Sequence, residues 1–218
     1  MPRIGSAVYL HGFASSPASS KATRFARELA ARGVPFACPD LNEPDFSALT
    51  VTRMLEQTGA VIDAARSPVA LIGSSLGAFV ALHAAAAAGT GKVDRLILMA
   101  PALDFGGNRL RQLGEVGIEE WRRSGKLRVH HYASGQPRDV GFELFEDAAQ
   151  YDALTLDLTL PILAFQGRHD ASVDPKMVER WAATRPNVRL RLLDDDHQLT
   201  RSIDPIWEES REFLELTD

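Results

Sequence analysis

One ten-residue segment constrains the fold more than any other part of the sequence. It reads VALIGSSLGA over residues 69–78, so that four apolar residues lead into a glycine, a serine pair, a leucine and a second glycine. Helix-forming residues then continue to Ala88. This order predicts a buried strand, a sharp turn and a helix, with a serine hydroxyl projecting above the carboxyl end of a sheet. We call residues 73–77 the elbow.

Within the elbow, Ser75 rather than Ser74 is the candidate nucleophile. Only Ser75 has a glycine both two residues before it, at Gly73, and two residues after it, at Gly77. A sharp turn brings these two positions against neighbouring backbone, where a side chain would clash. The alternative is a closely packed helix N-terminus in which Ser75 is only a helix cap.

Short apolar runs alternate with longer helical patterns along the rest of the chain, which is typical of a sheet covered by helices. Most of these runs are apolar throughout, as in strands that are buried on both faces. The alternation predicts an α/β fold with a mostly parallel sheet of about six strands and helices on both faces. We expect strands at 7–10, 34–38, 69–72, 96–100, 162–166 and 188–193, and helices at 21–32, 47–66, 76–88, 176–184 and 206–216.

Prolines and glycines mark several of the expected helix ends. Asp174-Pro175 and Asp204-Pro205 each place a capping carboxylate before a proline at the first helical position. Gly89 suits a C-terminal stop after the alanine-rich helix.

The segment from about residue 103 to 156 breaks this alternation. It shows no clear strand pattern, and turn signals such as Ser134-Gly135 interrupt it. An insertion of this length in a compact domain usually serves a function. We therefore expect a cap over the site, with helices near 109–125 and 141–151, as part of one domain spanning residues 1–218. The alternative is an irregular peripheral excursion.

A second glycine-containing segment, YLHGF over residues 9–13, ends the first expected strand. When a nucleophile adds to a carbonyl group, negative charge develops on the oxygen, and backbone N–H groups aimed at that oxygen lower the barrier. We expect the N–H groups of Phe13 and Leu76 to form this oxyanion hole, with Gly12 giving the backbone freedom to turn. His11 is expected to orient the loop rather than to act as a base.

A nucleophilic serine needs a base and an acid, expected on later loops in the order Asp or Glu, then His. His197 is the one histidine that follows the last expected strand. Asp170 and Asp174 both follow the strand before it. We favour Asp170 as the acid because Asp174 is already placed to cap a helix.

Three consecutive aspartates, Asp194, Asp195 and Asp196, precede His197. Carboxylates packed around a histidine would favour its protonated form, which cannot accept a proton. We expect the three side chains to face solvent, where screening weakens their effect. A metal site is the alternative, although the second set of ligands that it would need is not evident.

Composition excludes several other classes of protein. The net charge of −5 and the lack of a Lys/Arg run argue against nucleic-acid binding. The N-terminus lacks the apolar core of a signal peptide, and the nearly uncharged stretch 68–91 indicates a strand and a helix rather than a membrane span. Cys38 is the only cysteine, so we expect a reducing cytoplasm, with Cys38 as a buried structural residue rather than a nucleophile.

The combination of these motifs resembles a known family. Residues 9–17, YLHGFASSP, followed by SKA at 20–22, are similar to the opening of the YqiA-type esterases, a small branch of the α/β-hydrolases. Their Gly-Ser-Ser-Leu-Gly elbow matches the elbow here, and their D-x-x-V-D motif looks like residues 170–174. The resemblance implies the α/β-hydrolase fold and hydrolysis of carboxyl esters with short acyl chains.

Two departures limit what the resemblance implies. Relatives often have glycine directly before the catalytic histidine, where this chain has Asp195-Asp196. The stretch 103–156 also matches nothing that can be aligned, so substrate preference does not carry over.

The sequence as a whole predicts a serine hydrolase that cleaves small carboxylic esters or thioesters through Ser75, His197 and Asp170, with an acyl-enzyme intermediate. This chemistry needs no cofactor and no metal, and the expected partner is a small-molecule ester or thioester. In one alternative, the same residues act on a peptide or carbon–carbon bond. In another, the fold is catalytically silent and binds a ligand.

Overall fold

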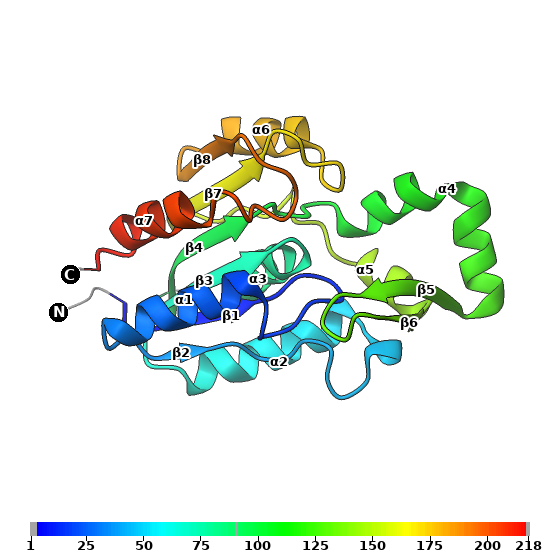
Figure 1. Ribbon diagram of the computed structural model, residues 1–218, viewed down its shortest axis with the longest axis horizontal. Helices are drawn as coiled ribbons and strands as arrows, with labels where there is room; N and C mark the ends of the chain where they lie inside the picture. The colour runs from blue at the N-terminus through cyan, green and yellow to red at the C-terminus, as the bar shows by residue number, and fades with distance from the viewer. Residues whose placement is uncertain (1–3, 90, 217–218) are drawn as a thin grey trace.

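The computed structural model describes residues 4–89 and 91–216, which are arranged around a six-stranded parallel sheet (Figure 1). The strand order is β2-β1-β3-β4-β7-β8, and each neighbouring pair is parallel. This confirms the predicted sheet, although the observed β2 is shorter than the strand expected over 34–38. The strands are β1 (Ser6–Leu10), β2 (Phe36–Ala37), β3 (Val69–Ser74), β4 (Val93–Met99), β7 (Ile162–Gly167) and β8 (Val188–Leu193).

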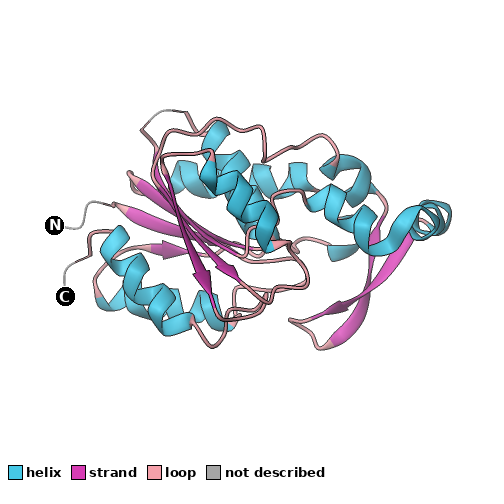
Figure 2. Cartoon of the chain, turned by 90° about the horizontal axis from the view of Figure 1, so that it is seen from above, coloured by secondary structure: helices cyan, strands magenta, loops and turns pink. Residues whose placement is uncertain are grey.

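Helices cover both faces of the sheet: α1 (Ser20–Ala31), α2 (Val51–Ala64), α3 (Leu76–Ala87), α6 (Pro175–Ala183) and α7 (Ile203–Phe213). On one face α1 and α7 meet through Phe25 and Trp207, whose rings lie edge to face at 5.5 Å. The helices α2, α3 and α6 pack in a second apolar cluster on the opposite face (Figure 2). Because both faces are covered, β1, β3 and β7 are buried along their whole length. No helix among the described residues is both long and apolar enough to cross a membrane.

The two predicted Asp-Pro helix starts have different outcomes. Asp174 caps α6 by accepting a backbone N–H at 3.0 Å, and Pro175 is the first helical residue, as predicted. The prediction for Asp204 is wrong. The buried carboxylate of Asp195, in the preceding loop, accepts the N–H of Ser202. For this reason α7 begins directly after Ser202. Asp204 therefore lies inside the first turn, where it pairs with Arg24 at 3.0 Å.

The helix predicted over 47–66 is divided in two. A 3₁₀ turn, η1 (Phe46–Ala48), comes first, and α2 begins only at Val51. Thr50 separates them because its hydroxyl accepts the N–H of Arg53 at 3.2 Å and so caps α2.

The insertion, residues 103–156, extends from the carboxyl end of the sheet (Figure 1). It contains α4 (Phe105–Ser124), which is kinked at Gly114, then β5 (Lys126–His131), β6 (Gln136–Gly141) and α5 (Glu143–Ala148). The two predicted helices are present with shifted ends, but the expectation of no strand is wrong, because β5 and β6 form an antiparallel hairpin. Both strands are largely exposed and rich in charged residues, so they lack the apolar pattern of the central strands.

The insertion also has a small apolar centre of its own. Trp121 of α4 packs edge to face on Phe142, with ring centroids 5.4 Å apart, and also contacts Phe145. The indole N–H of Trp121 donates to the carbonyl of Val140 at 3.2 Å, which joins the helix to the hairpin.

Candidate active site

The elbow adopts the sharp turn that its glycines predict. Ser75 lies between β3 and α3 with φ 54° and ψ −115°, a left-handed conformation that is costly for a residue with a side chain. A Cβ atom on Gly73 would come within 2.5 Å of the backbone of Ala78, and one on Gly77 would collide with the carbonyl of Leu10 in β1. Glycine is therefore required at both positions.

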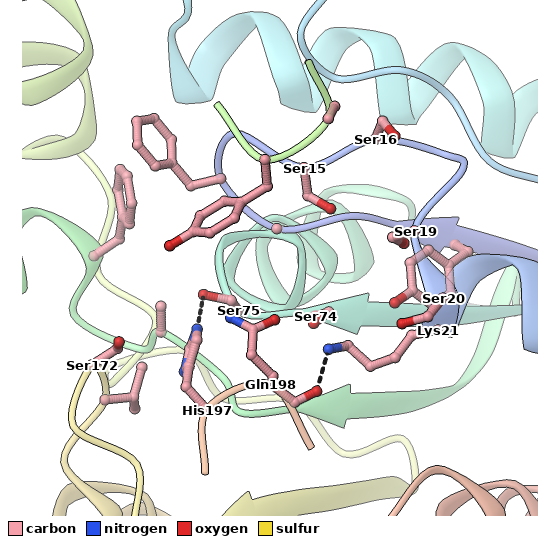
Figure 3. A pocket seen from close by; sticks show the side chains of 18 of the residues that line it. Ser15, Ser16, Ser19, Ser20, Lys21, Ser74, Ser75, Ser172, His197 and Gln198 are labelled. Carbon is pink, nitrogen blue, oxygen red and sulfur yellow. Dashed lines mark hydrogen bonds between the residues drawn. The ribbon is translucent and has the colours of Figure 1, made fainter. Parts of the chain in front are cut away.

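Three side chains predicted from the sequence meet at the carboxyl end of the sheet. Ser75 Oγ lies 3.1 Å from Nε2 of His197, and Nδ1 of His197 lies 2.8 Å from Oδ2 of Asp170 (Figure 3 shows the first of these bonds). Because Nδ1–H donates a hydrogen bond to the carboxylate, Nε2 carries no proton and can accept a hydrogen bond from the serine hydroxyl. The arrangement allows proton transfer from Ser75 to His197.

The Asp170 carboxylate is fully buried and has hydrogen-bond donors on both oxygens. The N–H groups of Ser172 and Val173 donate to Oδ1 at 2.8 Å each, and Nε2 of Gln166 donates to Oδ2 at 2.9 Å. Burial raises the pKa of this carboxyl, but the bonds from His197, Val173 and Gln166 outweigh burial and hold it below its ordinary value. Asp170 is therefore kept ionised and fixed in orientation.

Gln166 is a part of this site that sequence reasoning missed. It is completely buried in β7, four residues before Asp170, and it is the polar member of the strand sequence ILAFQG. A polar side chain in a strand buried on both faces needs an internal partner. The presence of one polar residue in an otherwise apolar buried strand is therefore the sequence signal that could have identified Gln166.

The expectation that all three aspartates before His197 face solvent is wrong for Asp195. Its side chain is buried and accepts the N–H groups of Asp196 at 2.8 Å and Ser202 at 2.9 Å. Burial raises the pKa of Asp195, but these hydrogen bonds and one from Arg201 hold it below its ordinary value. The tight turn into α7 leaves backbone N–H groups that need an acceptor, and Asp195 provides one.

The other two aspartates are exposed, as expected. Asp194 pairs with His169 at 2.7 Å, so His169 points away from Asp170. Asp196 accepts the N–H of Gln198 at 2.8 Å. These contacts fix the loop that carries His197.

The loop after β1 passes directly beside the nucleophile. A Cβ atom on Gly12 would lie 3.4 Å from Cβ of Ser75, so the absence of a side chain permits this close approach. His11 holds the loop as expected, because its Nδ1 donates to the Gly12 carbonyl and its Nε2 accepts the N–H of Leu41, both at 2.9 Å. The role of the Phe13 and Leu76 N–H groups in binding an oxyanion stays a prediction.

A cavity of about 540 Å³ opens beside Ser75 and His197. One part of its lining is apolar or aromatic: Phe13, Ala102, Phe105, Tyr132, Ala133 and Val173. Another part is polar and comes from the segment that leads into α1 and from the first two residues of that helix: Ser15, Ser16, Ser19, Ser20 and Lys21. Figure 3 shows these serines and Lys21 on one side of the Ser75–His197 pair and Ser172 on the other. We call residues 15–21 the polar arm.

Other candidate groups are not equipped for chemistry. Cys38 is half-buried, and burial together with Asp40 raises the pKa of its thiol to about 12, so it is not a ready nucleophile. The described residues contain no group of three or more His, Cys, Asp or Glu side chains that could hold a metal ion.

A protein family matches nearly the whole chain. The family described as "Uncharacterised protein family (UPF0227)" matches residues 6–209. The chain belongs to this family. The match confirms the resemblance to the YqiA-type proteins, while no curated protein matches the sequence.

Solved structures similar to this UPF0227 member share its fold. A protein of Agrobacterium vitis S4 is 25% identical, with 97% of this chain and 88% of that chain covered and a TM-score of 0.84. Est1E of Butyrivibrio proteoclasticus with bound ferulic acid is 20% identical (99% and 92% covered, TM-score 0.83). Mouse alpha/beta hydrolase domain-containing protein 10 is 22% identical (100% and 92% covered, TM-score 0.82). The fold is that of the α/β-hydrolases.

Proposed function

We propose that the protein is a serine hydrolase that cleaves small carboxylic esters or thioesters. The observation that carries this proposal is the series of hydrogen bonds from Ser75 through His197 to Asp170, beside a cavity. A buried, ionised carboxylate and a strained serine have no evident structural purpose at this position, but both are what acyl transfer requires. Est1E, which shares this fold, binds ferulic acid, and a carboxylic acid is the type of product that ester hydrolysis releases.

In the proposed mechanism, Ser75 Oγ attacks the acyl carbon while His197 takes its proton. Asp170 stabilises the imidazolium that forms, and the N–H groups of Phe13 and Leu76 bind the oxyanion. His197 then gives the proton to the leaving alcohol or thiol. Water attacks the acyl-enzyme with His197 again as the base, which releases the acid and restores Ser75.

We further propose that the insertion acts as a cap within one domain. It brings Phe105, Tyr132 and Ala133 to the cavity. The size and shape of the substrate are therefore selected by contacts with the insertion rather than with the sheet. This supports a division in which the sheet performs the chemistry and the insertion selects the acyl group.

The test is hydrolysis of short nitrophenyl esters and matched thioesters by purified protein. We expect Ser75→Ala to lower kcat by about four to six orders of magnitude without changing the fold. Ser74→Ala, one residue earlier in the elbow, should retain hydrolysis. Equal loss in both variants, or equal rates in wild type and Ser75→Ala, would refute the assignment. The ratio of ester to thioester rates then decides between the two substrate classes.

A further inference from the structure

Lys21 occupies a place that the stability of the fold does not explain. It lies in the first turn of α1, where the helix dipole disfavours a cation. Its side chain is also only 8% exposed, and burying an ammonium group is costly unless it is paired. Because the helix dipole and burial both disfavour the charged form of Lys21, we expect a partner that compensates for them.

The contacts of Lys21 within the chain supply only part of that compensation. Its ammonium group donates to the carbonyl of Gln198 at 2.5 Å. Burial lowers the pKa of Lys21, while the charges of Asp195 and Asp196 favour the ammonium form. Neither carboxylate lies within ion-pairing distance of Lys21 among the described residues, and both accept backbone N–H groups instead. An ammonium group has three donors, so two are left for another acceptor.

The cavity beside Ser75 is where such an acceptor would bind. Lys21 lines it together with four serines of the polar arm, whose hydroxyls can donate to the same group. Figure 3 shows Lys21 and these serines on one side of the Ser75–His197 pair. A charged donor surrounded by hydroxyls suits an oxyanion better than an alkyl chain, which would leave the two remaining donors of Lys21 without an acceptor.

We propose that the polar arm binds an anionic group of the substrate, a carboxylate or a phosphate, so that the enzyme prefers esters that carry such a group over neutral esters. This rests on the proposed function and names its substrate class. The inference gives Lys21 a role in specificity, separate from the role of Gln198 and its neighbours in holding His197.

The test compares kcat/KM for two pairs of esters in a pH-stat assay. Methyl hydrogen adipate against methyl hexanoate places a carboxylate on the acyl side, and the acetyl ester of glycerol phosphate against that of glycerol places a phosphate on the leaving group. We expect wild type to prefer the anionic ester in at least one pair, and the preferred pair identifies the anion. Lys21→Met should lower that preference by about ten- to a hundredfold.

Two further variants provide a second test of the polar arm and a control. Ser20→Asp puts a negative charge at an exposed helix start, where it does not disturb folding, and should also lower the preference. Lys92→Met removes a lysine that pairs with Asp63 outside the cavity and should leave the preference unchanged.

Three outcomes would overturn the inference. Wild type could show no preference in either pair, or Lys21→Met could slow both esters of a pair equally, which would mean that Lys21 only holds the Gln198 carbonyl. The preference could also survive Ser20→Asp and Lys21→Met together. If wild type hydrolyses neither neutral nor anionic esters, the proposed function itself fails, and the inference fails with it.

Discussion

The two walls of the cavity are built in different ways. The wall formed by the sheet holds Asp170 fully buried with donors on both oxygens, and its elbow tolerates no side chain at Gly73 or Gly77. The wall formed by the insertion presents the end of an exposed hairpin, with Tyr132 66% exposed. The helix α4 beside it is kinked and leaves Val116, outside the cavity lining, 83% exposed. The wall formed by the sheet is fixed by buried hydrogen bonds and close backbone contacts, whereas the wall formed by the insertion has few of them.

The two walls should therefore differ in how well they tolerate mutation. A residue whose partners are all internal cannot be altered without leaving a buried group unsatisfied. An exposed residue over the cavity can be altered with little effect on folding. The chemistry should therefore be sensitive to mutation in the sheet, and selectivity should respond to mutation in the insertion.

The largest effect should come from Asp170→Asn. The amide cannot stabilise the imidazolium and favours the wrong tautomer of His197, so we expect kcat to fall by about 10⁴-fold. Asp174→Ala is the control, because Asp174 caps α6 and should cost only about 1 kcal/mol of unfolding free energy. If Asp174→Ala abolishes activity and Asp170→Asn retains it, the two roles are reversed.

A smaller effect is expected for Asp195→Asn, measured as the free energy of unfolding. The variant weakens the bonds to the N–H groups of Asp196 and Ser202, so we expect a loss of about 1–3 kcal/mol at neutral pH. The exposed Asp196→Asn should stay within about 0.5 kcal/mol.

The Asp195 effect should also depend on pH with a defined sign. Because folding lowers the pKa of Asp195, its charge stabilises the fold above the ordinary carboxyl value of about 3.9, and this contribution is lost as the pH falls below that value. The difference in unfolding free energy between wild type and Asp195→Asn should therefore be constant from pH 7 to 5 and shrink below about pH 3.9. A difference that grows on acidification would show that the sign is wrong.

The smallest effect should come from the insertion. We expect Tyr132→Ala to change the ratio of kcat/KM for an aromatic and an aliphatic acyl ester by about two- to tenfold, since ring contacts contribute about 0.5–1.5 kcal/mol. Stability should hardly change. Val116→Ser, on the same insertion but outside the cavity lining, should leave the ratio unchanged. Complete loss of activity in Tyr132→Ala would contradict the claim that the insertion sets selectivity while the sheet performs the chemistry.

The same contrast decides what could be read from the sequence. The apolar runs predicted the strands of the sheet, because a strand that is buried on both faces needs apolar side chains. The glycines at 73 and 77 predicted the turn at Ser75, because the backbone there leaves no room for a side chain. The hairpin β5–β6 was missed because charged, exposed strands lack that pattern. Burial of Asp195 was also missed, since its partners are backbone N–H groups of a turn that no residue type announces.

The most direct test of the account is labelling with a fluorophosphonate, which reacts with a serine only when a base activates it. We expect one equivalent of adduct on the peptide that contains Ser75, none in Ser75→Ala, and much slower labelling in His197→Ala. Labelling of Ser74 or of another serine would contradict the assignment of the nucleophile. An unlabelled, folded protein would show that the α/β-hydrolase fold here binds a ligand without cleaving it.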